Sequence, residues 1–342
     1  MNLKWAVFFY CLFVVVINGC SKIPCYPPDH YAPEPNAPYT AEEVRIPTPK
    51  GHKLAGTLTL PTMVKAPYPA VLVITGSSPQ ERDHMQNSRG PSSMYQPFRQ
   101  ISDAISRKGI AVLRMDDQGT GCSEGEELEN VTIQERANDS RAGIQYLRKR
   151  SEIDSSRIGL LGLSEGANIG PIIAASDPTI RSIVMMAPTA TDGYRIMEYQ
   201  NRLKIDDRPD LSASEKEREL KKSMKGLSHA LAMGEGSPWF RSFIEYLPLP
   251  TAKKVTCPAL ILHGDKDAHI PVSDSHLIAQ AMRASGNDDV TVIVFKNHNH
   301  LFLEDPNGNI SGYADLLWHT NQISDNVITI ITDWLQSHMF FN

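Results

Sequence analysis

The pentapeptide Gly162-Leu163-Ser164-Glu165-Gly166 constrains the fold of this 342-residue chain more than any other feature. The apolar run 158–161 before it predicts a buried strand, and residues 167–175 after it have the pattern of a packed helix. A serine at such a strand-to-helix turn has a strained backbone, and the flanking glycines are needed because a Cβ there would meet neighbouring backbone. The free N–H groups of the helix start point to where a negatively charged oxygen could be held. Alone, the pattern also fits an ordinary glycine-rich turn.

Two further strand-and-loop pairs follow in an informative order. Residues 259–263 and 290–295 are apolar or β-branched runs that predict strands, and the loops after them carry acidic residues and then histidines. A serine hydroxyl is a poor nucleophile at neutral pH, so an imidazole must take its proton and a carboxylate must orient that imidazole. The order serine, acid, histidine is that of α/β-hydrolases, which place these groups at the carboxyl ends of parallel strands.

Two acids and two histidines compete for these roles. Asp265 directly follows a glycine and is expected to shape the turn, whereas Asp267 lies far enough along the loop to reach back over the sheet. His300 precedes an apolar pair that can anchor its loop, whereas His298 is interpreted as a solvated loop histidine. Asp267 and His300 are therefore the preferred partners of Ser164. The other histidines, His263 and His269 included, are interpreted as surface or satisfied core residues.

Several longer motifs resemble one family. Their sequences are similar to signature blocks of bacterial α/β-hydrolase esterases with the nucleophile block G-H-S-E-G, and they occur in the same order from about residue 39 to 335. This resemblance implies an α/β-hydrolase fold: a mostly parallel eight-stranded sheet with helices on both faces and a helical cap insertion. It also strengthens the assignment of Ser164, Asp267 and His300. The matching blocks are LAGTLTLP at 54–61, GSSPQERD at 76–83, DDQGTGCS at 116–123, GLSEG at 162–166, GDKDAHIP at 264–271 and NHLF at 299–302.

Three positions depart from the family pattern. Leu163 replaces the usual histidine before the nucleophile, Gln118 replaces the arginine of the D-D-R-G loop, and Thr75 replaces a histidine at the end of the third strand. The Gln118 change is expected to remove an ion pair. None of the three replaces a triad residue, so the expected type of reaction is unchanged. They do change polar groups near the pocket, so the pocket electrostatics and the preferred substrate cannot be carried over from the family.

The oxyanion-binding groups can be predicted from the same motifs. One donor is the backbone N–H of Glu165, the residue after the nucleophile, and the other is the backbone N–H of Ser77, where Gly76 lets the chain turn sharply. The Glu165 carboxylate would be unhelpful beside a developing negative charge. We therefore expect this side chain to lie at the pocket rim and to point away, towards Arg82.

The domain organisation follows from a break in the strand–helix alternation. Residues 41–342 are expected to form the α/β-hydrolase domain, with a polar, mostly helical cap inserted at about 189–250. Ser212 and Glu215 form a capping-box pattern within it. The cap is expected to cover Ser164, to supply aromatic pocket walls and, lacking a deep acyl tunnel, to favour short acyl chains. The aromatic residues are Trp239, Phe240, Phe243 and Tyr246.

These features together predict a serine hydrolase for small carboxylic esters. Amide or peptide hydrolysis and acyl transfer remain alternatives on the same triad, and a non-catalytic surface binding protein is a further class. A net charge of −5 with interspersed signs makes nucleic acid an unexpected partner. There is no zinc-type Cys/His spacing or phosphate-binding glycine loop, and the chemistry requires neither metal nor cofactor. The oligomeric state is not predicted.

The N-terminus predicts export. A short positive start and thirteen apolar residues, 5–17, precede Asn18-Gly19-Cys20, so residues 1–19 are expected to be a lipoprotein-type signal peptide with lipidation at Cys20. Residues 20–40 are rich in proline and predict a stiff tether to a bacterial membrane in the cell envelope. The mature chain would keep three cysteines besides the lipidated one, an odd number that argues against a disulfide framework.

Overall fold

The computed structural model describes residues 23–84, 86–87, 94–308, 316–317 and 320–340. The predicted signal peptide and Cys20 lie outside the described residues. Within the described part of the chain, no helix is long and apolar enough to cross a membrane.

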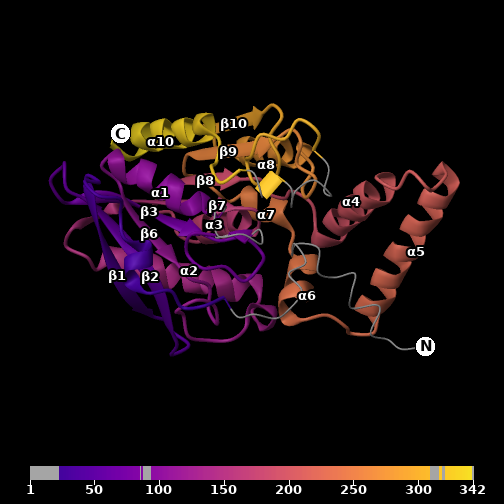
Figure 1. The fold of residues 1–342 in the computed structure, drawn as a ribbon, viewed down its shortest axis with the longest axis horizontal. Helices are drawn as coiled ribbons and strands as arrows, with labels where there is room; N and C mark the ends of the chain where they lie inside the picture. The colour runs from indigo at the N-terminus through magenta and orange to yellow at the C-terminus, as the bar shows by residue number, and fades with distance from the viewer. Residues whose placement is uncertain (1–22, 85, 88–93, 309–315, 318–319, 341–342) are drawn as a thin grey trace.

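The core of the molecule is one eight-stranded sheet, which occupies the centre of Figure 1. Its strand order is β1-β2-β6-β3-β7-β8-β9-β10, and the six strands from β6 to β10 in that order are parallel to one another. The first two strands pair antiparallel with each other, and β2 pairs antiparallel with β6. The strands are β1 (Tyr39–Pro47), β2 (Lys53–Pro61), β3 (Tyr68–Ile74), β6 (Ala111–Met115), β7 (Ile153–Leu163), β8 (Ile180–Met186), β9 (Ala259–Gly264) and β10 (Val290–Phe295).

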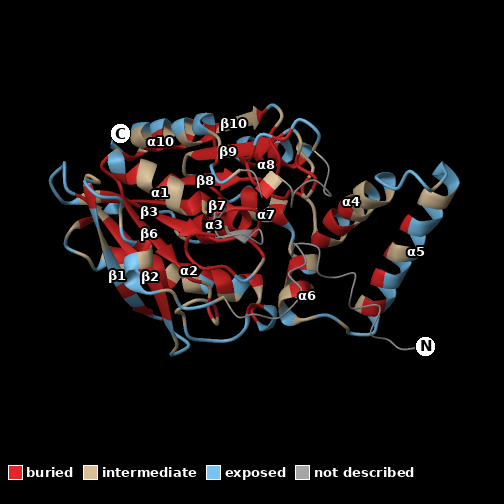
Figure 2. Cartoon of the chain, in the orientation of Figure 1, coloured by how far each residue is buried: buried red, intermediate tan, exposed pale blue. Residues whose placement is uncertain are grey.

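Helices cover both faces of this sheet. The buried apolar side chains of α1 and α10 form one core with one face, and those of α2, α3, α7 and α8 form a second core with the other. Figure 2 shows the central strands almost wholly buried between these layers. The helices are α1 (Pro97–Arg107), α2 (Ile133–Arg148), α3 (Glu165–Ala174), α7 (Pro248–Ala252), α8 (Ser273–Arg283) and α10 (Asp325–Phe340).

The predicted α/β-hydrolase fold class is confirmed by this topology. β1 forms one edge of the sheet, whereas β2 is an interior strand because it pairs with β1 on one side and with β6 on the other.

Four helices stand between β8 and β9: α7 packs on the sheet, and the other three extend away from it on the right of Figure 1. These three are α4 (Gly193–Asp206), α5 (Ala213–Ala232) and α6 (Pro238–Glu245), and we call them the cap. Ser212 and Glu215 form the capping box at the start of α5, with both reciprocal hydrogen bonds. The cap has a small apolar cluster of its own, built from Met197, Leu220, Met224, Leu227 and Phe240.

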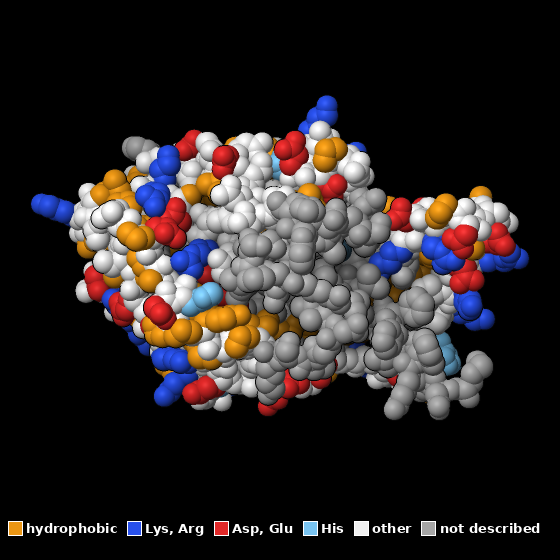
Figure 3. All heavy atoms as spheres, in the orientation of Figure 1, with side chains coloured by type: hydrophobic (Ala, Val, Ile, Leu, Met, Phe, Trp, Pro, Cys, Tyr) orange, Lys and Arg blue, Asp and Glu red, His pale blue; other side chains and the backbone are white. Residues whose placement is uncertain are grey.

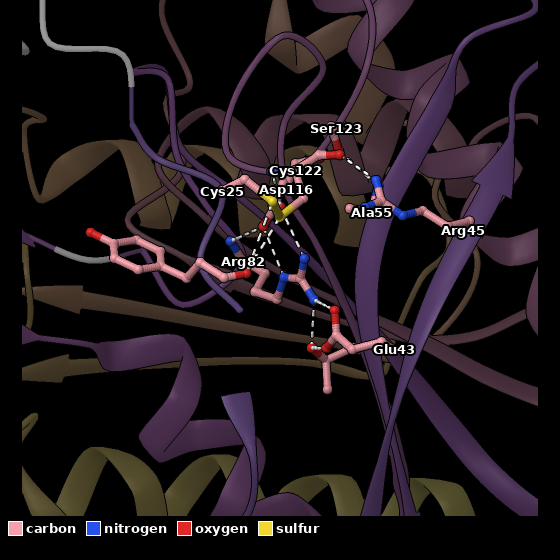
Figure 4. The surroundings of a disulfide bond; sticks show 10 residues. Cys25, Glu43, Arg45, Ala55, Arg82, Asp116, Cys122 and Ser123 are labelled. Carbon is pink, nitrogen blue, oxygen red and sulfur yellow. Dashed lines mark hydrogen bonds and ion pairs between the residues drawn. A yellow bond between two sulfur atoms is a disulfide. The ribbon is translucent and has the colours of Figure 1, made fainter. Parts of the chain in front are cut away.

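A disulfide joins Cys25 to Cys122 and ties the N-terminal segment to the loop after β6. Figure 4 shows this bond beside Arg82 and Asp116. The odd cysteine number argued against a disulfide framework, and for this pair that inference is wrong; Cys257 is the cysteine left free in the described chain. Counting cysteines could not find the pair, because the two lie 97 residues apart and meet only through the fold.

The N-terminal segment also packs on the domain beyond the disulfide. Tyr31 is buried with the Arg82 guanidinium 4.0 Å above its ring, and Arg99 donates hydrogen bonds to the carbonyl oxygens of His30 and Ala32. Residues 30–32 of the segment predicted as a stiff tether therefore pack on the surface of the domain through aromatic and cationic contacts.

Charges of both signs are interspersed over the molecule. In Figure 3 lysine, arginine, aspartate and glutamate side chains alternate on the visible described surface, including the cap. Several are close pairs along the helices, such as Lys221 with Glu217 on α5 at 3.7 Å. Charges of both signs are thus interspersed on the described part of this face, as they are along the sequence.

Candidate active site

Ser164 occupies a strained turn between β7 and α3. Its φ is 58° and its ψ is −117°, a left-handed conformation that non-glycine residues rarely adopt outside functional sites. An added Cβ at Gly162 would lie 2.2 Å from the carbonyl oxygen of Gly166, and one at Gly166 would lie 2.3 Å from that of Ile74. Both glycines are therefore required by close backbone approach, for the reason that the motif predicted.

Asp267 and His300 meet across two loops at the carboxyl ends of β9 and β10. The Nδ1 atom of His300 lies 2.7 Å from Oδ2 of Asp267, and both side chains are buried. The other oxygen, Oδ1, accepts backbone N–H bonds from His269 and Ile270 at 2.8 and 2.9 Å, which fixes the carboxylate plane. The structure thus brings together the acid and the histidine that the sequence favoured.

The ionisation state of Asp267 follows from its surroundings. Burial opposes the charge, but the charge of His300 and hydrogen bonds from His263 and His300 outweigh burial and hold the pKa of Asp267 below its usual range. His263 was interpreted as a satisfied core residue, and its Nε2 lies 3.2 Å from both Asp267 Oδ2 and the Ile270 carbonyl oxygen. This second imidazole beside the acid was not predicted as part of the site.

The rejected candidates have structural roles. Asp265 accepts the backbone N–H of Asn297 at 2.6 Å, so it shapes the turn as predicted. His298 was interpreted as solvated, which is wrong: it is 6% exposed, its Nδ1 lies 2.7 Å from the Lys296 carbonyl oxygen, and its ring packs against Phe295. The pattern of polar and apolar residues along this loop did not indicate that His298 is buried.

The loop after β3 passes close to the nucleophile. An added Cβ at Gly76 would lie 3.7 Å from the Ser164 Cβ, and the Gly76 N–H donates to the Gln80 side chain at 3.1 Å. Ser77 follows directly and is buried. This arrangement places the backbone of Ser77 near Ser164, and the Glu165 N–H lies at the first turn of α3.

The Glu165 side chain has partners that the sequence analysis did not identify. It is 4% exposed, not at the rim; its Oε2 lies 3.0 Å from Arg136 Nη1 and accepts the Trp239 indole N–H at 2.9 Å. The expected partner, Arg82, lies elsewhere and binds Asp116 and Glu43. The prediction of Arg82 was wrong because Arg136 belongs to α2, which no motif connects to the nucleophile.

Two other histidines lie at the site without having been predicted there. The His269 ring lies 4.7 Å from the His300 ring, and burial with the charge of His300 lowers the pKa of His269 to about 3. The same two causes lower the pKa of His84 to about 3, which places His84 within electrostatic reach of His300. Both therefore stay neutral at neutral pH. His84 directly follows the motif at 76–83, which is the one sequence signal that could have identified it.

Thr75 and Gln118, two of the departures from the family pattern, help to line a small cavity of about 30 Å³ with both polar and apolar walls, room for about one water molecule. Thr75 donates to Asp117 and accepts from Arg136, and Gln118 donates to Asp139. The predicted loss of an ion pair at Gln118 is thus accompanied by a hydrogen bond to Asp139. The third substitution, Leu163, is buried against core residues of the α1 and α10 face.

One group in the described chain has the proximity of a metal site. Ligand atoms of Asp267, His269 and His300 lie within 4.8 Å of one another. Both oxygens of Asp267 already accept hydrogen bonds, and two of the three residues are the candidate acid and base. The arrangement is accounted for by proton-transfer chemistry without assigning a metal.

The family of the chain can be stated from its sequence. Residues 98–326, more than half of the chain, match the model of the prolyl oligopeptidase family. This chain belongs to the prolyl oligopeptidase family. The recognition of an α/β-hydrolase related to bacterial esterases, made from the motifs, is confirmed.

Individual relatives carry esterase names. Over 257 residues the chain is 29% identical to Esterase EstD of Thermotoga maritima, covering 73% of this chain and 58% of that protein. Over 152 residues it is 27% identical to Esterase FrsA of Yersinia pestis, covering 44% of this chain and 32% of that protein. The chain thus spans between a third and somewhat over half of the length of these relatives. The Pyrococcus furiosus esterase Pf2001 has the same fold, with a TM-score of 0.59 at 15% identity over 94% of this chain and 99% of that one.

Proposed function

We propose that this chain is a serine hydrolase that cleaves carboxylic esters. Ser164 is the nucleophile, His300 the general base and then acid, and Asp267 the residue that orients His300. The observation that carries the proposal is the 2.7 Å contact between Asp267 and His300, at the same sheet edge as a serine with a φ of 58°. The esterase names of EstD and FrsA support the ester-cleaving assignment.

The proposed reaction has two halves. His300 Nε2 takes the Ser164 proton as Oγ attacks the acyl carbon, and the N–H groups of Ser77 and Glu165 hold the resulting oxyanion. Collapse expels the alcohol, which receives the proton from His300 and leaves an acyl-serine. Water, deprotonated by His300, then attacks the acyl-serine; the acid is released as His300 returns the proton to Ser164 Oγ. Asp267 keeps the His300 Nδ1 proton and stabilises the imidazolium in both halves.

The test is the activity of Ser164→Ala on p-nitrophenyl esters. Its kcat should fall by about four orders of magnitude or more while the fold stays intact, because triad residues act as a unit. A fluorophosphonate should label wild type and leave Ser164→Ala unlabelled. Full activity in Ser164→Ala would show that the reaction, if any, uses another group, and an inactive wild type would favour a non-catalytic binding protein.

Substrate choice is part of the proposal. We expect short acyl chains, on the order of two to eight carbons, since each methylene contributes about 1–3 kcal/mol of discrimination. The peptidase description of the family keeps amide cleavage as a second candidate. A panel of p-nitrophenyl esters of rising chain length beside aminoacyl-p-nitroanilides separates the two. Faster turnover of the anilides, or of long-chain emulsions, would replace the short-chain ester assignment.

We also propose that the enzyme works outside the cytoplasm, attached to a membrane of the bacterial envelope by lipid on Cys20. The apolar N-terminal run and Gly19-Cys20 motivate this, and the Cys25–Cys122 disulfide supports it because such bonds persist in oxidising compartments. Two or more acyl chains anchor a protein stably where one does not. In a bacterial host, wild type should incorporate radioactive palmitate and partition into detergent, and Cys20→Ala should do neither. Unchanged labelling of Cys20→Ala would reject the lipid site.

A further inference from the structure

The cap contacts the body of the molecule at the residues that build the candidate site. On α4, the Tyr199 hydroxyl donates to the carbonyl oxygen of Asp267 at 2.9 Å, and the Gln200 amide donates to that of His269 at 3.0 Å. On α6, the Trp239 indole N–H donates to Glu165 at 2.9 Å. The cap therefore contacts both the acid loop and the residue that follows the nucleophile.

The contact at Glu165 belongs to a buried arrangement of charges. Arg136 lies 3.0 Å from Glu165 Oε2 and 3.2 Å from Asp117 Oδ1, so one guanidinium lies between two carboxylates. The second carboxylate oxygen of Glu165, Oε1, is buried and has no hydrogen-bond partner among the described residues. The Trp239 N–H is therefore one of the few groups that fix the buried carboxylate of Glu165, the residue whose backbone N–H is the proposed oxyanion donor.

Trp239 is itself held in place. Its ring stacks on Phe243 with centroids 5.6 Å apart and planes 9° from parallel. Its carbonyl oxygen accepts from the Ser242 hydroxyl at 2.8 Å, and that hydroxyl accepts the N–H of Ile133, the first residue of α2, at 3.0 Å. The helix α6 is thus fixed to α2, which also carries Arg136, and the indole has one preferred direction.

We propose that Trp239 is a positioning residue: through its hydrogen bond to the Glu165 carboxylate, the cap sets the orientation of the Glu165 backbone N–H in the oxyanion hole. This inference rests on the proposed serine-hydrolase function and deepens it. Trp239 lies on the cap, but its effect should appear in the transition state. The oxyanion that the Glu165 N–H binds forms in the transition state and is absent from the bound substrate. A tryptophan that lined the acyl pocket alone would act on substrate binding.

The test combines kinetics with a transition-state analogue. Trp239→Phe keeps the aromatic ring and removes the N–H; kcat on p-nitrophenyl acetate should fall roughly tenfold with KM changed less than twofold, below the 10²–10³ typical for removing an oxyanion donor. A trifluoromethyl ketone, which forms an oxyanion on the serine, should lose affinity by the same factor. The matched control is Tyr194→Phe, which removes a cap hydroxyl on α4 that lies 2.9 Å from the Ser228 Oγ on α5 and should change neither value.

A double-mutant cycle with Glu165 tests the coupling directly. In a Glu165→Ala background, Trp239→Phe should weaken the ketone by less than twofold, because its partner is gone. Glu165→Gln keeps an acceptor for the indole and should lose less ketone affinity than Glu165→Ala. Additive losses, equal losses in the two Glu165 variants, or a rise in KM with unchanged ketone affinity would each overturn the proposal. Fluorophosphonate labelling of Ser164 is read separately, so failure of the proposed function is distinguishable.

Discussion

At the scale of single residues, the site depends on which carboxylate faces the imidazole. Asp267 makes four short contacts, two from backbone N–H groups and two from histidines. Asp265, two residues away, is exposed and accepts one backbone N–H. Two similar carboxylates in one loop therefore have different roles because one faces the interior and the other faces the turn.

This difference predicts opposite outcomes for matched mutations. Asp267→Asn and His300→Ala should lower kcat on a p-nitrophenyl ester by roughly 10⁴-fold, since the first loses the correct imidazole tautomer and the second the base. Asp265→Asn and His298→Ala should lower kcat less than threefold in the folded protein. Steady-state kinetics with circular dichroism checks the set, and a larger loss in Asp265→Asn than in Asp267→Asn would reverse the acid assignment.

A second residue-scale prediction concerns pH. Desolvation raises the pKa of Asp139 to about 6, above the roughly 3.9 of an unfolded aspartate, although His52 and Gln118 favour its charged form. The folded state therefore binds more protons than the unfolded state between about pH 4 and 6. The contribution of Asp139 to the free energy of unfolding is therefore complete below about pH 4 and is lost as the pH rises through about 6.

Asp139→Asn should remove that dependence, because asparagine does not ionise. Urea midpoints measured from pH 4 to 7 should fall less steeply with rising pH in the variant than in wild type. Asp288→Asn, at an exposed position, is the control. Parallel curves for wild type and Asp139→Asn would contradict the raised pKa.

At the scale of elements, one buried arginine joins four separate segments. Arg82 donates to Asp116 after β6, to Glu43 on β1 and to Thr57 on β2, while its own residue lies on the loop after β3 (Figure 4). The Arg82 and Asp116 side chains are both fully buried. The GSSPQERD block at 76–83 and the DDQGTGCS block at 116–123 are therefore linked, because Arg82 of the first pairs with Asp116 of the second.

Removing this arginine should be costly. Arg82→Gln leaves Asp116 buried without its charge partner, which typically costs about 3–5 kcal/mol. The control is Arg208→Gln, whose pair with Asp210 is about half exposed and should change stability by less than about 0.5 kcal/mol. Urea unfolding of both variants measures the difference. A small loss in Arg82→Gln would show that Asp116 is solvated or protonated in its place.

The sequence predicted elements well where local patterning decides them. Apolar periodicity predicted the strand before Ser164 and the helix after it. The Ser212 and Glu215 pattern predicted the capping box of α5. The sequence predicted side-chain partners poorly, as at Glu165, because Arg136 and Trp239 lie 29 residues before and 74 residues after it in the chain. Contacts of this kind depend on how helices pack, which periodicity does not specify.

At the scale of the whole molecule, the fold could be predicted from local sequence motifs, whereas the disulfide could not. Motif order was sufficient for the α/β-hydrolase fold, since the serine, acid and histidine blocks each fix a loop at the carboxyl edge of one sheet. The disulfide was missed because its second cysteine lies inside a motif that was interpreted for other reasons. The bond attaches the N-terminal segment beside Arg82 and Asp116, at the loops that link the sheet to the site.

The last prediction is the contribution of this bond to stability. Cys25 and Cys122 close a loop of 97 residues, and cross-links of that length are worth about 4.7 kcal/mol in the chain-entropy account and typically 2–4 kcal/mol when measured. The double variant Cys25→Ser, Cys122→Ser should lose about 2–4 kcal/mol in urea unfolding and keep its esterase kcat below the transition, because neither cysteine contacts the candidate triad. Cys257→Ser is the control: burial raises the pKa of that thiol to about 12, so it is inert as a nucleophile at neutral pH. Reductant should shift the urea midpoint of the wild type towards that of the double variant and leave the double variant unchanged. If reductant does not change the wild-type midpoint, the N-terminal segment is held by its aromatic and arginine contacts alone.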